Sequence, residues 1–469
     1  MNITFLGAAR NVTGSRFLIE YNGKKFLIDC GLFQERDFQY RNWDDFPVNP
    51  AGIDAVLLTH AHIDHCGYLP KLVREGFHGP IYCTLPTADI TTISLLDSAK
   101  LQKSDAENKK KRHKREGRKG KHPEVPLYTA EDVEKVFSLF KHVRYNQELP
   151  LLDDLKAVFY DAGHILGSAM IEIRFKEGGM EKVCVFSGDI GRNNRPILDD
   201  PHLFDRADYV VMEATYGDRV HEHKDVSLEK LRNVINETKD RGGNVIIPAF
   251  AIERVQEILY YLNQLVRDGD IPPLKTFVDS PMAADVTRVF TKSVDFYDEE
   301  SLAILRQHQS LFDSSFLRMT KSVEDSKAIN DVKEPVIIMA GSGMCTGGRI
   351  KHHLVKHISR PENTILFVGY QAYGTLGRQI LEKPERVRIL GETYPVKARI
   401  EVINGFSGHA DKEELLEWIG HMSSKPEKIF IVHSEEKTAE RFAETLRTEK
   451  GFEVIVPQYQ QQINIVGDV

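Results

Sequence analysis

Along residues 1–85, short apolar runs alternate with glycine-containing turns, a pattern that predicts β-strands. Residues 17–21 and 25–29 flank the dipeptide Asn22-Gly23, which is a strong signal of a two-residue hairpin turn. Residues 55–59 are apolar with a β-branched side chain among them, so we expect a buried strand there. Further strands are expected at 155–174, 183–186 and 208–212. The first part of the chain therefore predicts a β-rich domain.

After about residue 215 the period changes, and helical and strand patterns alternate. Helices are expected at 228–239, 252–266, 282–291 and 350–358, and strands at 244–248, 275–278, 335–340 and 364–368. Such alternation predicts a parallel sheet covered by helices on both faces. A strand at 399–403 is expected to return the chain to the β-rich pattern of its first part. A strand at 428–433 and a helix at 437–449 are expected to follow. We therefore expect an α/β fold in which residues 213–396 form a domain inserted into an outer domain of residues 1–212 and 397–469.

The composition is that of a globular protein, and it narrows the setting. The 469 residues are 28% charged, carry a net charge of −7, and contain no apolar run long enough to span a membrane. The first ten residues do not have the pattern of a secretory signal. The five cysteines are scattered and include no C-x-x-C pair, which argues against a disulfide framework and favours a cytoplasmic protein. Because the whole chain is acidic, any nucleic-acid binding requires local positive charge or metal.

The strongest chemical signal is His60-Ala61-His62-Ile63-Asp64-His65, directly after the expected strand at 55–59. Three imidazoles and a carboxylate suit a borderline-soft divalent metal. One tight loop cannot direct all four groups at a single ion, so two neighbouring metals would relieve the crowding. The alternative is a polar loop that happens to be rich in histidine.

Other metal-capable side chains follow expected strands elsewhere: His164, Asp189 and His433. Each of them alone is more typical of a turn or of a solvated side chain. Together they would complete the site that the first motif requires. Asp29 ends another strand, either as a turn residue or as a carboxylate that orients a ligand histidine.

These residues resemble a known family. Asp29, the 60–65 motif, His164 and Asp189 are similar to motifs one to four of the metallo-β-lactamase superfamily. Glu213-Ala214-Thr215-Tyr216-Gly217, Phe406-Ser407-Gly408-His409-Ala410-Asp411 and His433 resemble motifs A, B and C of its β-CASP branch. The resemblance implies a metallo-β-lactamase αββα sandwich with an inserted α/β (β-CASP) domain of mostly parallel sheet. Within this branch, the chain most resembles the bacterial and archaeal RNases that are similar to the endonuclease subunit of the cleavage and polyadenylation specificity factor.

The resemblance also implies a role for each position. His60, His62 and His164 would hold one zinc ion, and Asp64, His65 and His433 would hold the other, with Asp189 bridging them. His409 would face the scissile phosphate beside Glu213, and Asp64 and Asp29 also count among the catalytic residues. The DNA-processing members of the β-CASP branch resemble one another in having a valine at the motif C position. Because this chain has His433 at that position, the resemblance favours RNA over DNA as the substrate. The His/Asp set would also accept Mn²⁺.

The expected activity is that of a zinc-dependent ribonuclease acting in RNA processing or decay. Two metals can activate a water for in-line attack on phosphorus, and His409 is the candidate acid for the leaving 3′ oxygen. The resemblance implies an endonuclease and allows 5′-to-3′ exonuclease activity as well. The alternatives are a small-molecule metallo-hydrolase on the same site, a DNA nuclease, and an RNA-binding scaffold whose site is vestigial.

Candidate substrate-binding residues come from the inserted domain and motif B. A glycine loop between an expected strand and helix offers backbone amides to a phosphate, although a close-packed turn explains it as well. The candidates are Ser280, Gly341, Ser342, Gly343, Met344 and Ser407. The basic run 109–121 is either a solvated helix end or loop, or an edge that contacts phosphates. The expected partner is single-stranded RNA, no membrane is involved, and the family resemblance allows a homodimer.

Overall fold

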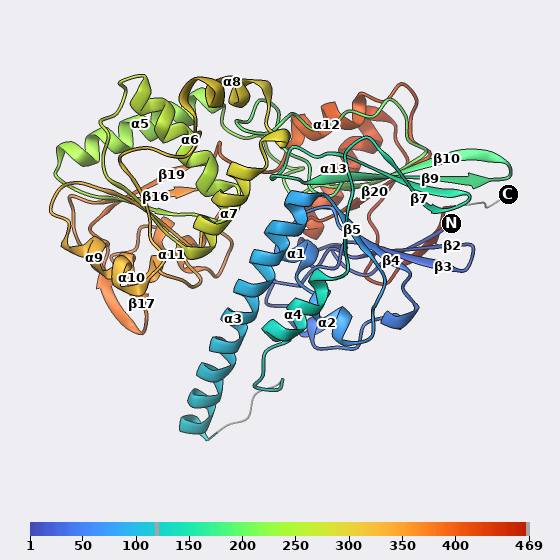
Figure 1. The fold of residues 1–469 in the computed structure, drawn as a ribbon, viewed down its shortest axis with the longest axis horizontal. Coiled ribbons are helices and arrows are strands. Elements are labelled where there is room, and N and C mark those ends of the chain that lie inside the picture. Colours follow the sequence, from blue (N-terminus) through green and yellow to red (C-terminus); the bar gives the residue numbers. More distant parts are fainter. Residues whose placement is uncertain (118–121, 466–469) are drawn as a thin grey trace. The chain divides into compact units, whose positions relative to one another are not determined.

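The computed structural model describes residues 1–117 and 122–465, and the chain forms two compact units (Figure 1). The first unit comprises Met1–Asn194, Asp199–Val220 and His409–Val469. The second comprises Arg195–Leu198 and His221–Gly408. A β-rich unit is thus interrupted by an inserted one, and the chain crosses between them near residues 195–198, 220 and 408.

Two seven-stranded sheets form the centre of the first unit. The apolar faces of both sheets meet in one core, where the ring centroids of Phe5 and Phe430 lie 5.5 Å apart. One sheet has the order β22 (Gln462–Asn464), β1 (Asn2–Phe5), β2 (Phe17–Tyr21), β3 (Lys24–Ile28), β4 (Ala55–Leu57), β5 (Ile81–Cys83) and β6 (Phe140–His142). The other has the order β21 (Val454–Ile455), β20 (Lys428–Val432), β11 (Tyr209–Glu213), β10 (Met180–Phe186), β9 (Ala169–Glu177), β8 (Leu155–Asp161) and β7 (Glu148–Leu152).

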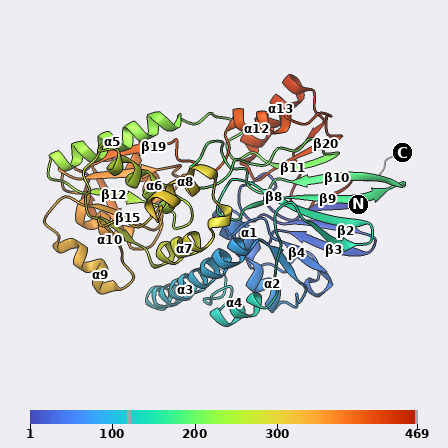
Figure 2. The same ribbon diagram turned by 45° about the horizontal axis from the view of Figure 1, so that its top comes forward.

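Helices cover the outer face of each sheet, with a separate apolar core beneath each layer (Figure 2). The first sheet is covered by α1 (Ile63–Cys66), α2 (Leu69–Arg74), α3 (Leu85–Glu116) and α4 (Ala130–Phe137). The second is covered by α12 (Lys412–Gly420) and α13 (Glu436–Lys450). Short 3₁₀ turns lie at Gln39–Asn42 and Pro50–Gly52. The expected αββα sandwich is confirmed.

Local signals explain where these elements begin and turn. Tyr21 pairs with Lys24, and Asn22 and Gly23 have φ values of 47° and 75°, as a two-residue turn of type I′ requires. The expected hairpin is therefore confirmed. Helix α3 continues to Glu116, so the part of the basic run at 109–116 is helical, while its residues 118–121 lie outside the described part of the chain.

The second unit contains a six-stranded sheet in which every neighbouring pair is parallel, as the alternating pattern predicts. Its order is β14 (Leu317–Met319), β13 (Thr276–Asp279), β15 (Ile337–Ala340), β12 (Val245–Pro248), β16 (Thr364–Val368) and β19 (Arg399–Ile403). The helices are α5 (Lys224–Asp240), α6 (Arg254–Arg267), α7 (Pro281–Lys292), α8 (Glu299–His308), α9 (Val323–Ala328), α10 (Ile350–His357) and α11 (Leu376–Leu381). A hairpin of β17 (Arg386–Ile389) and β18 (Glu392–Pro395) and 3₁₀ turns at Val294–Phe296 and Ile329–Asp331 complete it.

One strand lies in a different domain from the one that its pattern suggested. The expectation that 399–403 restarts the outer domain is wrong, because β19 pairs in parallel with β16 over its whole length. Its side chains join the core of the inserted sheet, where Ile400 packs with Ile365 and Phe367. An edge strand that is apolar on one face looks the same in sequence whichever sheet it joins.

A buried carboxylate holds together three segments of the second unit. Asp279 ends β13 and is 1% exposed. It accepts hydrogen bonds from His353 Nε2 at 2.8 Å and Arg349 Nη1 at 2.7 Å. Thr320 Oγ1 and Ser326 Oγ each donate to it at 2.6 Å. Burial raises the pKa of this carboxyl, but these donors outweigh burial and hold the pKa below its ordinary value.

The Asp279→Asn variant should lose stability in a way that depends on pH. At pH 7 we expect its free energy of unfolding to fall by about 3 kcal/mol, because the Arg349 guanidinium loses its buried counter-charge. A carboxyl with a lowered folded-state pKa stabilises the fold above its unfolded-state pKa of about 3.9, and this contribution disappears as the pH falls further. The difference between wild type and variant should therefore narrow below about pH 4. Urea unfolding at several pH values measures it.

The exposed carboxylate of Asp313 provides the matched control. The Asp313→Asn variant should unfold like the wild type. If the difference in the free energy of unfolding between wild type and Asp279→Asn stayed constant below about pH 4, the role assigned to the charge of Asp279 would be contradicted.

Candidate functional site

Within the first unit, polar side chains gather where several strands of both sheets end. Asp29 follows β3, and His60 lies three residues after β4. His164, Asp189 and His433 follow β8, β10 and β20 in the other sheet. The strands are apolar because both of their faces are packed, so the first positions beyond their ends are where polar groups can converge.

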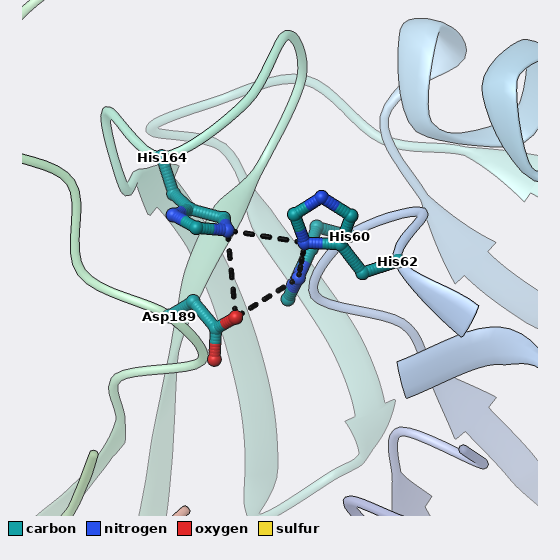
Figure 3. A group of neighbouring side chains, drawn as sticks. All are labelled: His60, His62, His164 and Asp189. Carbon is teal, nitrogen blue, oxygen red and sulfur yellow. Dashed lines mark hydrogen bonds and ion pairs between the residues drawn. The ribbon is translucent and has the colours of Figure 1, made fainter. Parts of the chain in front are cut away.

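His60, His62, His164 and Asp189 form the first group, and their side chains point toward one another (Figure 3). His62 Nδ1 lies 3.1 Å from the Nε2 atoms of both His60 and His164. Asp189 Oδ2 lies 3.3 Å from His60 Nε2 and 3.4 Å from His164 Nε2. Tetrahedral ligands about 2.0–2.1 Å from a metal ion lie about 3.4 Å from one another, so these four atoms fit one divalent ion.

Asp64, His65 and His433 form a second group beside the first. His433 Nε2 lies 3.1 Å from His65 Nε2 and 3.4 Å from Asp64 Oδ2. Asp189 Oδ1 approaches the same two imidazoles, at 3.2 Å from His65 and 3.6 Å from His433. This oxygen is buried and accepts no hydrogen bond from the described residues. A buried carboxylate oxygen without a donor, facing two imidazole nitrogens, fits a second cation.

The two groups therefore share Asp189, since its Oδ2 faces the first and its Oδ1 faces the second. Five of the histidine and aspartate side chains are almost completely buried: His60, His65, His164, Asp189 and His433. Packing fixes their positions, so the site does not need to be assembled by the metal from mobile loops.

Three further residues orient the candidate ligands from behind. Asp29 is fully buried, and its Oδ2 lies 2.7 Å from His65 Nδ1, which leaves Nε2 of that ring facing the second group. Thr59 donates its backbone N–H and its hydroxyl to Asp29, and its Oγ1 lies 3.0 Å from His60 Nδ1. Thr215 Oγ1 lies 3.1 Å from both Nδ1 and the carbonyl oxygen of His433.

The sequence by itself assigns no supporting role to Thr59 or Thr215. The only indication of such a role in the sequence is the position of each threonine. Thr59 directly precedes the first histidine of the 60–65 motif, and Thr215 follows Glu213 by two residues. Neither signal distinguishes a threonine that supports a ligand from one that only ends a strand.

Burial and the neighbouring charges set the protonation of the two groups. Burial lowers the pKa of His60 to about 3 and that of His62 to about 4, so both rings are neutral, as metal ligands must be. Burial also lowers the pKa of His433, but the Asp189 charge and the Asp64 hydrogen bond outweigh it and raise that pKa to about 9. In Asp189, burial raises the pKa, and the charges of His433 and His65 hold it well below its ordinary value. A cation at this carboxylate would take the place of those protons.

A third group joins Asp189 to Glu213 and His409. His409 Nδ1 lies 3.0 Å from Glu213 Oε1 and 3.9 Å from Asp189 Oδ2. Glu213 is fully buried and also accepts from the backbone N–H of Ile190 at 2.8 Å. Burial lowers the pKa of His409, but the Glu213 and Asp189 charges outweigh it and raise that pKa. The His409 side chain is 20% exposed, so it meets solvent at the rim of the buried ligands.

The candidate substrate-binding residues all lie in the second unit. Ser280 caps α7 by accepting from Ala283 N at 3.2 Å. Ser342 Oγ accepts from Thr346 N at 3.0 Å, and the carbonyl oxygen of Met344 accepts from Gly377 N at 3.1 Å. Gly341 and Gly343 belong to the same loop after β15, and Ser407 is buried after β19. The structure places these residues at strand ends and in turns, and their binding role stays a prediction.

Comparisons with known proteins agree with this architecture. Residues 18–205 match the metallo-beta-lactamase superfamily domain and residues 255–380 match the Beta-Casp domain. Residues 393–457 match a domain described as the Zn-dependent metallo-hydrolase RNA specificity domain.

Similar proteins extend over nearly the whole chain. A protein named Ribonuclease TTHA0252 from Thermus thermophilus is 39% identical, covering 93% of this chain and 94% of its own length. A protein named Transcription termination factor FttA from Methanocaldococcus jannaschii is 34% identical over 95% of this chain and 69% of its own. A crystal structure of a protein of unknown function from Enterococcus faecalis has the same fold, with a TM-score of 0.54 and 12% identity over 98% of this chain.

The fold and the site define a metallo-β-lactamase-type hydrolase that uses divalent metal. More narrowly, the chain belongs to the β-CASP branch of that superfamily, together with proteins named as a ribonuclease and as transcription termination factors. Among the described residues, no helix is long and apolar enough to cross a membrane.

The Asp29→Asn variant should bind metal more weakly while remaining folded. The amide cannot offer two charged oxygens to His65 Nδ1 and Thr59, so the imidazole loses its fixed orientation and basicity. We expect a roughly 10- to 100-fold loss of affinity for the second ion, measured by competition with a chelator. The Asp45→Asn variant, which changes an exposed carboxylate, is the control, and equal affinity in both variants would contradict the role of Asp29.

Proposed function

We propose that this protein is a zinc-dependent ribonuclease that hydrolyses RNA phosphodiester bonds in RNA processing or decay. The observation that carries the proposal is the pair of His/Asp groups that share Asp189, with His409 at their rim. A relative named as a ribonuclease over nearly its full length supports the substrate class. We propose endonuclease activity and, in addition, 5′-to-3′ exonuclease activity.

In this proposal each group would hold one Zn²⁺ ion. His60, His62 and His164 would hold the first, Asp64, His65 and His433 would hold the second, and Asp189 would contribute a carboxylate to both groups. When bound, the two ions would lower the pKa of a water toward neutrality and offset charge on the phosphoryl oxygens. Imidazole and carboxylate ligands favour zinc and also accept Mn²⁺. Asp29 would keep His65 in the tautomer that such binding needs.

His409 would protonate the leaving 3′ oxygen. Its Nδ1 is directed at the buried carboxylate of Glu213, and Nε2, on the opposite side of the ring, would be the proton donor. The two neighbouring carboxylates favour the protonated ring, which a general acid requires. Glu213 is itself fixed by Ile190 N and Thr215 N, so the imidazole has one preferred orientation.

The other candidate functions are less well supported. The histidine at the motif C position, His433, favours RNA over DNA, as does the match to a domain described by RNA specificity. A small-molecule hydrolase could use the same ligands, but it would have no use for the inserted unit or for His409 beside Glu213.

Three finer expectations remain proposals: a cytoplasmic location, single-stranded RNA as the substrate form, and a homodimer. The location is supported by the five cysteines, which are free and buried, as is typical of a protein in a reducing compartment. Single-stranded RNA is the proposed substrate form. A homodimer is proposed from the family resemblance alone, and light scattering of the purified protein would test it.

The His409→Ala variant should cut RNA at least about 100-fold more slowly, because it lacks the proton donor, yet bind both metals. Cleavage rates are measured on single-stranded RNA labelled at the 5′ end or internally, and on matched DNA. The sizes of the labelled products distinguish internal cuts from stepwise degradation. Chelation should abolish cutting by the wild type, and zinc should restore it.

The exposed histidine variant His78→Ala is the matched control and should cut like the wild type. If the wild type holds two metals and cuts neither polymer, the ribonuclease proposal fails. Unchanged cutting by His409→Ala would instead remove only the role assigned to that ring.

The chemistry of the product ends provides a separate prediction. Attack by water should leave 5′-phosphate and 3′-hydroxyl ends, whereas attack by the neighbouring 2′-hydroxyl would leave a 2′,3′-cyclic phosphate. Treating the products with phosphatase and ligase distinguishes the two sets of ends. A cyclic phosphate would overturn the proposed mechanism even if cleavage depends on metal.

A further inference from the structure

Three aromatic side chains of the second unit are exposed on loops at strand ends. Phe250 is 45% exposed, Tyr370 is 46% exposed and Tyr373 is 92% exposed. Large apolar rings are usually buried in a folded domain, and a group of exposed rings is typical of a binding surface. The metal chemistry of the first unit does not account for them.

The sheet topology brings these rings to one edge. β12 and β16 are parallel neighbours, and Val245 pairs with Thr364. Phe250 and Tyr370 each lie two positions beyond the carboxyl end of their strand. β15 is the other neighbour of β12 and leads into the loop that begins at Gly341. Three adjacent strands therefore deliver two rings and the glycine loop to the same edge of the sheet.

Contacts with Gly343 fasten these loops to one another. A Cβ atom on Gly343 would lie 2.8 Å from the Phe250 ring, so the ring rests directly on this glycine. Gln371 Nε2 donates to the carbonyl oxygen of Gly343 at 3.1 Å, which places the neighbouring Tyr370 at the same loop. Gly377 N donates to Met344 O at 3.1 Å. The exposed rings are thus held by a connected set of backbone and side-chain contacts.

Tyr373 occupies the tip of a turn within this set. Thr375 N donates to Ala372 O at 3.2 Å, and Gly374 adopts a φ of 81°, which closes the turn around the tyrosine. The ring therefore reaches solvent on nearly all sides. A tyrosine at this point contributes little to packing, so its side chain can be changed without removing core contacts.

The charge of the three loops is opposite to that of the whole protein. Residues 249–252, 341–351 and 369–378 contain no aspartate or glutamate, although the chain carries a net charge of −7. Of their three basic residues, Arg349 forms an ion pair with Asp279 and Arg378 forms one with Glu382. Within the described residues, Lys351 forms no ion pair. Flat rings beside cationic side chains suit a polyanion that carries aromatic bases.

We propose that Phe250, Tyr370 and Tyr373 form a stacking surface for the unpaired bases of the RNA substrate. This proposal rests on the ribonuclease function proposed above and adds the way in which the substrate is held. The rings stack on bases, while Lys351 and Arg378, whose ion pair with Glu382 is exposed, meet the phosphates. Because every base has a flat face, the surface selects single strands over duplexes without selecting a sequence.

Binding to two ligands that differ only in their bases tests the proposal. The probes are a fluorescent oligoadenylate of about 12 nucleotides and an abasic oligomer with the same backbone, and both are titrated into full-length His409→Ala protein loaded with zinc. We expect Tyr373→Leu and Phe250→Leu each to weaken oligoadenylate binding about fivefold or more, from the lower end of the stacking range. Binding of the abasic oligomer should not change. Tyr373→Phe should restore oligoadenylate binding, because it keeps the ring.

Tyr40→Leu in the first unit is the matched control, since Tyr40 is 42% exposed, and it should bind oligoadenylate like its parent. The proposal is overturned if Tyr373→Leu binds oligoadenylate normally, which is also the result expected if the rings serve a protein partner. An equal loss of affinity for the abasic oligomer would overturn it as well. Cleavage by protein with intact His409 is scored separately. Base-dependent binding without cleavage would therefore contradict only the ribonuclease function, and cleavage with ring-independent binding would contradict only the stacking surface.

Discussion

The buried carboxylate of Asp189 is the constraint on which the site depends. Its two oxygens face two different sets of imidazoles, and one of these oxygens has no hydrogen-bond donor among the described residues. An uncompensated charge in such a position is costly, so the arrangement is favourable only when positive charge lies beside it. Cationic histidines can supply that charge, and so can divalent metal. The cluster is therefore a place where metal binding and folding stability are coupled.

The αββα sandwich makes this arrangement possible. Two sheets packed through one core fix the ends of β4, β8, β10 and β20 relative to one another, so residues distant in sequence meet without a flexible linker. Behind the ligands, Asp29, Thr59 and Thr215 fix ring orientations through hydrogen bonds. The chemistry is thus supported by two layers of rigid contacts, which is how proteins keep a metal site ready before the metal arrives.

In the second unit, too, the residues of interest lie at the ends of strands. Its parallel sheet places Asp279, the glycine loop after β15 and the exposed rings on successive strands. Buried charge is neutralised at Asp279, where four donors converge on one carboxylate. At the neighbouring strand ends, Phe250 and Tyr370 stay exposed. Adjacent strand ends of one sheet therefore carry a buried charge that stabilises the fold and the exposed rings that we propose bind bases.

The sequence by itself determined the local elements and the kind of chemistry. The hairpin at Asn22-Gly23, the parallel pattern of the inserted sheet and the His60–His65 motif are all encoded in a few adjacent residues. Only the tertiary structure decided which sheet β19 joins, since an edge strand carries no mark of its partner. Tertiary structure also decided that Asp189 faces two groups and that Thr215 supports His433. These relations join residues far apart in the chain, and only packing brings such residues within hydrogen-bond distance.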